Sequence, residues 1–111
     1  MRTLRDNEIA LLVKLTDSVE GGAEFAQQLS HVRVRDDSTP TFLRLQVDDY
    51  PGVPGVADGP IPGRFPVVRN GELLGEMMVW VTNGRLAGLE FSWVTDLAPA
   101  HMPNADEVQI D

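Results

Sequence analysis

The chain has 111 residues, no cysteine, and a formal net charge of −8 that arises from 17 acidic side chains against 9 Lys and Arg side chains. This length fits one core, so residues 1–111 are expected to form a single domain, and the lack of cysteine excludes disulfides and thiolate metal sites. The negative charge disfavours nucleic acid and anionic membranes as partners and favours a basic protein.

The N-terminal residues do not read as a targeting segment. Charged residues continue to Glu8, and the apolar run over 9–13 is followed at once by Lys14. A signal peptide needs an apolar stretch of about 7–15 residues, and a transmembrane helix needs about 20. We therefore expect a cytoplasmic protein.

Two helices are predicted at the start of the chain. Apolar residues recur at helical spacing over residues 4–17, and Thr3 is the expected N-cap. The pair Gly21-Gly22 interrupts this pattern. A shorter helix over residues 23–30 follows.

The hydrophobic period then changes from that of a helix to two. Residues 31–35 and 42–47 alternate cleanly and are separated by a turn-rich segment over 36–40. A four-residue loop over 37–40 would place Arg33 opposite Arg44. The buried face of this hairpin would then carry Val32, Val34, Leu43, Leu45 and Val47.

Residues 48–63 are predicted to form a loop. The segment contains four prolines and four glycines, and proline cannot donate to a sheet ladder. Loops longer than about 12–15 residues without secondary structure are usually functional or disordered.

Two dipeptides predict a three-stranded meander in the second half of the chain. Asn70-Gly71 and Asn83-Gly84 favour type I′ hairpin turns, and each is flanked by strand-like residues. The expected strands cover residues 65–69, 72–82 and 85–94.

Two-residue turns imply a regular register, in which Glu76 lies opposite both Phe65 and Phe91. One sheet face would carry the larger side chains, which are Phe65, Val67, Leu74, Met78, Trp80, Leu89, Phe91 and Trp93. The opposite face would be apolar but shallow and would carry Val68, Leu73, Gly75, Met77, Val79, Val81, Leu86, Gly88, Glu90, Ser92 and Val94. Two helices can cover only one face, so the other is predicted to be an interaction surface.

The expected fold is therefore α+β. Two N-terminal helices pack on an antiparallel sheet of five strands that ends in the meander, and residues 107–110 could add a sixth strand at an edge. The residues predicted to bind a partner are Trp80, Met78, Val79 and Glu90 on the sheet and Asp48, Asp49 and Tyr50 in the loop.

Glu76 is the one candidate for an acid catalyst. A carboxyl group between two phenylalanines has a raised pKa and can serve as a general acid, unless this part of the face meets solvent. No second catalytic group is placed beside it, and the chain has no G-x-S-x-G turn. We predict no catalytic residue with an assigned role and no cofactor.

Two further patterns could bind ligands. The pairs Asp36-Asp37 and Asp48-Asp49 could hold a divalent cation, but aspartates at strand ends more often cap turns. The spacing of His31 and His101 is not that of a metal site. No metal is therefore predicted. The strand residues Arg33, Arg35 and Arg44, with Phe42 beside them, could suit single-stranded nucleic acid. The acidity of the whole chain favours a solvated outer face instead.

The segment 70–96, NGELLGEMMVWVTNGRLAGLEFSWVTD, resembles small uncharacterised proteins of GC-rich actinobacteria. In size, acidity and helix-plus-sheet design, the chain is also loosely similar to immunity proteins of bacterial toxin systems. These resemblances imply no site residues.

The function hypotheses come from three classes, of which the third is a nucleic-acid-linked regulator that uses the face with Arg33, Arg35 and Arg44. The first is an acidic protein-binding domain, which is either an immunity or inhibitor protein for a basic partner such as a toxin, or a module that forms a homodimer. The second is a small enzyme or ligand-binding protein with a pocket near Glu76.

Overall fold

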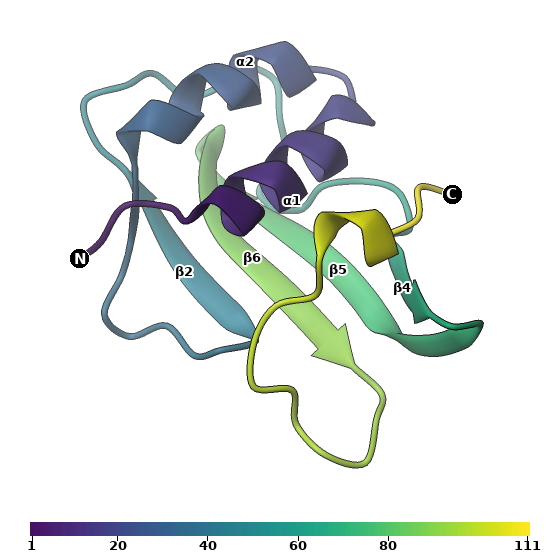
Figure 1. The fold of residues 1–111 in the computed structure, drawn as a ribbon. Coiled ribbons are helices and arrows are strands. Elements are labelled where there is room, and N and C mark those ends of the chain that lie inside the picture. Colours follow the sequence, from purple (N-terminus) through teal and green to yellow (C-terminus); the bar gives the residue numbers. More distant parts are fainter.

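Helices lie on only one side of a twisted antiparallel sheet in the computed structural model, which describes residues 1–111 (Figure 1). The helices are α1 (Asp6–Asp17), α2 (Gly22–Gln28) and two 3₁₀ turns, η1 (Leu29–His31) and η2 (Ala105–Glu107). The strands are β1 (Val32–Val34), β2 (Phe42–Val47), β3 (Gly59–Pro60), β4 (Pro66–Arg69), β5 (Glu72–Thr82) and β6 (Arg85–Trp93). The predicted α+β class, with N-terminal helices on an antiparallel sheet, is confirmed.

Helix α1 begins two residues later than predicted. Arg5 rather than Thr3 is its N-cap, because the Glu8 side chain reaches back and accepts the Arg5 backbone N–H at 2.7 Å. Leu11, Leu12 and Leu15 of α1 are fully buried against the sheet. None of the helices has the length and hydropathy that a membrane crossing requires.

All strand pairs are antiparallel, in the order β1-β2-β6-β5-β3. Strand β4 pairs with the first half of β5, and β3 pairs with its second half, so the two short strands share one edge of β5. The two N-terminal helices and η2 all lie over the same face of the sheet (Figure 1). The hydrophobic core lies between them and this face.

The β1–β2 hairpin differs from its predicted register by two residues. Arg33 lies opposite Gln46, not Arg44, because the loop closes with a tight turn that pairs Thr39 with Phe42. An even shift leaves every side chain on its expected face. Four of the five residues predicted for the buried face are buried, namely Val32, Val34, Leu43 and Leu45, whereas Val47 is half-buried against the core.

Both predicted Asn-Gly turns form, but neither hairpin keeps a regular register. Next to the turns, Arg69 pairs with Glu72 and Thr82 pairs with Arg85. Farther along, one extra residue interrupts each ladder, Leu74 in β5 and Ala87 in β6. A one-residue bulge moves all later side chains of a strand to the opposite face relative to its partner.

The bulges overturn the predicted division of the two faces. The side chains that face the helices and are buried are Phe65, Val67, Met77, Val79, Val81, Leu86, Leu89 and Phe91. Met78 and Trp80, which were expected beside Phe65 and Phe91, point to the other face. Burial of each large apolar side chain stabilises the fold by about 1.5–3 kcal/mol. The helices therefore cover the sheet face that carries these eight buried side chains.

Each terminal segment pairs with one edge strand of the sheet. Val34 of β1 donates its N–H to the Arg2 carbonyl at 2.7 Å. At the opposite edge, Val108 bridges Val67 of β4, and Gln109 donates to the Pro66 carbonyl at 2.8 Å. The edge pairing expected for residues 107–110 thus forms as an isolated bridge after η2.

The segment over residues 48–63, which was predicted to be a loop, lies on the end of the β5–β6 hairpin and is a loop except at Gly59–Pro60, which form β3. Val53 donates its N–H to the Gly84 carbonyl at 2.8 Å, and Asp58 accepts the Asn83 N–H at 2.8 Å. Ile61 donates to the Val79 carbonyl at 2.9 Å as the loop returns to the sheet. These three attachments hold the loop against the hairpin.

Candidate functional site

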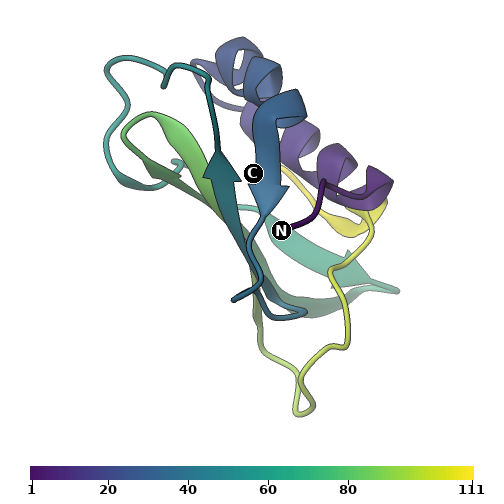
Figure 2. The ribbon, with the colours of Figure 1, turned by 90° about the vertical axis from the view of Figure 1, so that its left-hand side faces the viewer.

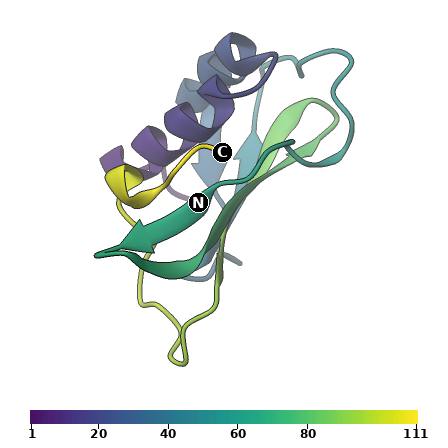
Figure 3. The same cartoon turned by 90° about the vertical axis from the view of Figure 1, so that its right-hand side faces the viewer.

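No element packs on the sheet face opposite the helices, as the two side views show (Figures 2 and 3). We call this surface the open face. It is formed by Arg33, Phe42, Arg44, Gln46, Glu76, Met78, Trp80, Gly88, Glu90 and Ser92.

Aromatic side chains from two strands meet at the centre of the open face. Phe42 of β2 and Trp80 of β5 lie on either side of Gly88, where an added Cβ would be 3.0 Å from Phe42 Cε1 and 3.3 Å from Trp80 Cβ. The Trp80 indole N–H donates to Glu90 Oε1 at 3.0 Å. Phe42 and Trp80 are half-buried, so part of each ring remains accessible to a partner.

Charge is divided across the open face. Its β1–β2 half carries Arg33 and Arg44, and the Arg44 guanidinium lies 4.9 Å from the centre of the Phe42 ring, within cation–π range. Its β5–β6 half carries Glu76 and Glu90. The face is therefore basic on its β1–β2 side and acidic on its β5–β6 side, and Phe42 of β2 lies directly opposite Glu90 of β6 where the two sides meet.

Asp37 lies beside the basic half of the open face. Arg35 follows β1, and its side chain donates to Asp37 at 3.1 Å; Arg44 is 3.9 Å from the same carboxylate. The hydrogen bond from Arg35 is the main reason that the pKa of Asp37 is below its usual range. This pair is exposed, so screening by solvent keeps its contribution small.

The residues predicted to bind a partner divide into three groups. Trp80, Met78 and Glu90 lie together on the open face and are half-buried. Val79 is completely buried against the helices, so its prediction as a surface residue is wrong; the bulge at Ala87 places it opposite Leu89 in the core.

Asp48, Asp49 and Tyr50 lie in the loop that follows β2, away from the centre of the open face. Tyr50 donates its hydroxyl to Gln27 of α2 at 3.0 Å. Asp48 accepts a hydrogen bond from Gln46 at 2.8 Å, at the border of the open face. These residues therefore connect the helix layer with the end of the sheet.

Glu76 does not lie between Phe65 and Phe91. Its neighbours across the ladders are Pro66 and Ser92, and its side chain is 38% exposed and ion-paired with Arg64. The bulge at Leu74 places Pro66 rather than Phe65 opposite Glu76, and the bulge at Ala87 places Ser92 rather than Phe91 opposite it. Glu76 is thus a partly exposed, ion-paired carboxylate, so the apolar environment expected for a general acid is absent.

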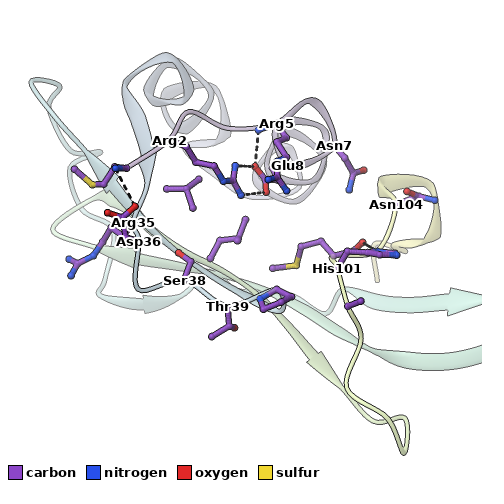
Figure 4. A pocket seen from close by; sticks show the side chains of 16 residues that line it. Arg2, Arg5, Asn7, Glu8, Arg35, Asp36, Ser38, Thr39, His101 and Asn104 are labelled. Atoms are coloured by element: carbon purple, nitrogen blue, oxygen red, sulfur yellow. Dashed lines mark hydrogen bonds and ion pairs between the residues drawn. The ribbon is translucent and has the colours of Figure 1, made fainter.

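A polar cleft of about 670 Å³ lies between the N-terminus of α1, the β1–β2 loop and the C-terminal tail (Figure 4). On the α1 side, Arg2 donates two hydrogen bonds of 2.8 Å to the Glu8 carboxylate. Burial alone raises the pKa of Glu8, but the hydrogen bonds from Arg2 and from the Arg5 N–H outweigh it, so the pKa is lowered.

The hydroxyl groups that line the cleft form hydrogen bonds within the β1–β2 loop. Ser38 Oγ accepts the Arg44 N–H at 2.8 Å, and Thr39 Oγ1 accepts the Phe42 N–H at 3.1 Å. His101, on the third side, contacts the Met102 carbonyl through Nδ1 at 2.9 Å. No hydroxyl in this cleft is hydrogen-bonded to a histidine, so the arrangement that activates a serine or threonine nucleophile is not present.

Two of these features escaped prediction from the sequence. The Trp80–Glu90 bond depends on the bulge at Ala87, and the Arg2–Glu8 pair joins a residue outside α1 to one within it. Glycines inside a strand often mark bulges, and Gly75 and Gly88 each follow a bulged residue. They were the signals that could have corrected the register.

No group of three or more His, Asp or Glu side chains is arranged to hold a metal ion. Comparisons with protein-family models, with curated proteins and with solved structures found no match to this chain. Its function is therefore inferred from its own residues.

Proposed function

We propose that this chain is a protein-binding domain that pairs with a second copy of itself through the open face. The aromatic centre supports this proposal. Tryptophan and arginine are the residue types that dominate binding energy at protein interfaces, and here Trp80, Phe42 and Arg44 adjoin on an uncovered sheet.

The division of charge on the open face favours a second copy of the chain as the binding partner. In a two-fold pair the same surface meets itself, so each contact occurs twice. If two open faces meet about a two-fold axis that runs along the strands, the strand order of one copy is reversed over the other, and the half with Arg33 and Arg44 lies over the half with Glu76 and Glu90 of the other copy. A uniformly basic partner would match only the half of this face with Glu76 and Glu90 and would meet Arg33 and Arg44 on the other half.

Sedimentation equilibrium of the purified chain at several concentrations tests this proposal. We expect a reversible dimer, and Arg44→Glu or Glu90→Arg should each weaken dimerisation by about ten-fold or more, since each places like charges in contact. The double variant Arg44→Glu/Glu90→Arg restores opposite charges and should restore the dimer. Asp17→Arg, an exposed change on the helix layer, is the matched control and should not alter dimerisation.

Two results would contradict self-association. The first is a monomer at every concentration, with circular dichroism showing a folded chain. The second is a dimer that tolerates Arg44→Glu, Glu90→Arg and Trp80→Asp alike, because such a dimer would use another surface.

A basic protein is the second candidate partner, and an immunity or inhibitor function for a toxin belongs with it. The net charge of −8 favours it, as does the position of Asp48 and Asp49 at the end of the sheet. This candidate predicts a monomer that forms a one-to-one complex with a basic protein. Asp48→Lys/Asp49→Lys and rising ionic strength should both weaken that complex.

A further inference from the structure

Another cavity, of about 620 Å³, lies between the turn that joins α1 to α2 and the loop that covers the β5–β6 hairpin. Cavities of about 300–1,000 Å³ hold small organic molecules. Apolar side chains form most of its wall, namely Val19, Phe25, Val53, Pro54, Val56, Ala57, Ile61 and Pro62. This cavity is separate from the open face and from the polar cleft of Figure 4.

Only two charged residues line this cavity, and both are acidic. Glu20 lies in the turn after α1, and Glu24 lies in the first turn of α2. Neither carboxylate takes part in an ion pair, and no arginine, lysine or histidine lines the cavity. The polar cleft differs in this respect, because Arg2 neutralises its buried carboxylate.

The carboxylate and the apolar wall meet at one point. Gly21 has a left-handed backbone, with φ of 86°, a conformation that favours glycine. Because glycine has no side chain, the cavity wall is bare backbone at this position. The position that its Cβ would take is 3.3 Å from a Val53 methyl, 3.9 Å from the Phe25 ring and 4.0 Å from Glu24 Oε2. The Glu24 carboxylate and the Val53 methyl therefore lie beside the same bare stretch of backbone, where the acidic and apolar parts of the wall adjoin.

We propose that this cavity binds a small organic cation with an apolar body, such as an aryl or alkyl amidinium, guanidinium or ammonium. The apolar wall would take up the body of such a molecule. Glu20 and Glu24, which are both exposed, would pair with its charge.

Other charges act on the same ligand. The C-terminus of α1 and the N-terminus of α2 flank the cavity, and because their dipoles have opposite sign there, the two carboxylates decide the local charge. The net charge of −8 also attracts cations to the chain and repels anions.

A nuclear magnetic resonance titration with benzamidine tests the proposal. Benzamide, which is neutral and of nearly the same shape, and benzoate, which is negative, serve as the ligand controls. We expect benzamidine to shift the backbone amide signals of residues 19–25 and 53–61, and to bind about ten-fold or more tightly than benzamide because of its charge.

Two double variants test which carboxylates bind the cation. Glu20→Gln/Glu24→Gln removes both carboxylates at nearly constant shape and should weaken benzamidine binding by about ten-fold. Glu72→Gln/Asp96→Asn makes the same change in net charge at exposed positions outside the cavity and should leave binding unchanged. The dimer of the proposed function should persist in both double variants, so the two proposals can fail separately.

The proposal is overturned if benzamidine shifts no signals around the cavity, if benzamide or benzoate binds as well as benzamidine, or if the two double variants weaken binding equally. In the last case the overall charge of the chain, and not the pair Glu20 and Glu24, would hold the cation.

Discussion

Trp80 and Glu90 are diagonal neighbours on β5 and β6, and the indole N–H of Trp80 donates to the Glu90 carboxylate at 3.0 Å on the open face. In a regular hairpin these two side chains would lie on opposite faces. The single extra residue Ala87 brings them together, and it also moves Leu89 and Phe91 into the core.

Deletion of Ala87 should therefore leave a folded protein. Removal of the bulged residue joins Leu86 to Gly88, so Val81 still pairs with Leu86 and Trp80 still pairs with Gly88. We expect a loss of about 1–2 kcal/mol in the free energy of unfolding, from lost packing and local twist. Urea denaturation followed by circular dichroism measures it.

Deletion of Met78, in a regular part of the same ladder, is the control. It reverses the faces of half of β5 and should abolish cooperative unfolding. If the deletion of Ala87 were as harmful as that of Met78, the assigned bulge would be wrong.

Substitution by alanine should destabilise the protein to different extents at two glycines within strands. A Cβ at Gly75 would lie 2.2 Å from the Ser92 carbonyl oxygen, which is backbone, and Gly75 has a φ of 151°. A Cβ at Gly88 would meet the Phe42 ring at 3.0 Å, and a ring on the surface can move aside.

We expect Gly75→Ala to cost about 3 kcal/mol or more and Gly88→Ala about 1 kcal/mol, from strain and overpacking respectively. Thermal unfolding of both variants decides this order. Equal losses at the two positions would contradict the close approach of β6 to Gly75.

The stabilisation from Glu8 should depend on pH. The pKa of Glu8 is lowered in the folded protein, so the ionised carboxylate stabilises the fold above its unfolded pKa of about 4.3, and this contribution is lost as the pH falls through the lower, folded pKa. Glu8→Gln should therefore cost about 1–3 kcal/mol at pH 7, and much less at pH 3.

Urea titrations of the wild type and of Glu8→Gln at pH 7, 5 and 3 measure the difference. Asp6→Asn, an exposed change in the same helical turn, provides the comparison. A cost for Glu8→Gln that is constant from pH 7 to pH 3 would mean that the charge of Glu8 is not involved.

The C-terminal segment should loosen without global unfolding when its ion pair is removed. Glu107 in η2 is paired with Arg69 of β4, and the hydrogen bond from Arg69 is the main cause of the lowered pKa of Glu107. Glu107→Gln should speed hydrogen exchange at the amides of Gln109 and Asp111, which pair with the outer edge of the sheet.

The midpoint of global unfolding should remain nearly the same, because the pair is at the surface. Asp106→Asn, one residue earlier and exposed, should leave the exchange rates unchanged. Unchanged exchange in Glu107→Gln would show that backbone pairing alone holds the segment.

Local chemistry in the sequence is enough to predict the elements and their order. The helical spacing before Asp17 predicts α1, and Asn70-Gly71 and Asn83-Gly84 predict both turns of the meander, because a positive φ at these positions is a property of the residues themselves. The α+β class follows from these elements. The candidate site follows only in part, since Met78, Trp80 and Glu90 were identified as surface residues but not as members of one face with Phe42 and Arg44.

Only the tertiary structure decides which side of the sheet each residue faces. A regular hairpin would place Glu90 and Ser92 with Val79 and Val81 beneath the helices, and would leave Leu89 and Phe91 outside. One extra residue costs little locally, whereas burial of Leu89 and Phe91 in place of Glu90 and Ser92 stabilises the fold by several kcal/mol, about 1.5–3 for each apolar side chain. The helices that cover the sheet thus select the bulge, and the bulge in turn places Trp80 and Glu90 on the open face.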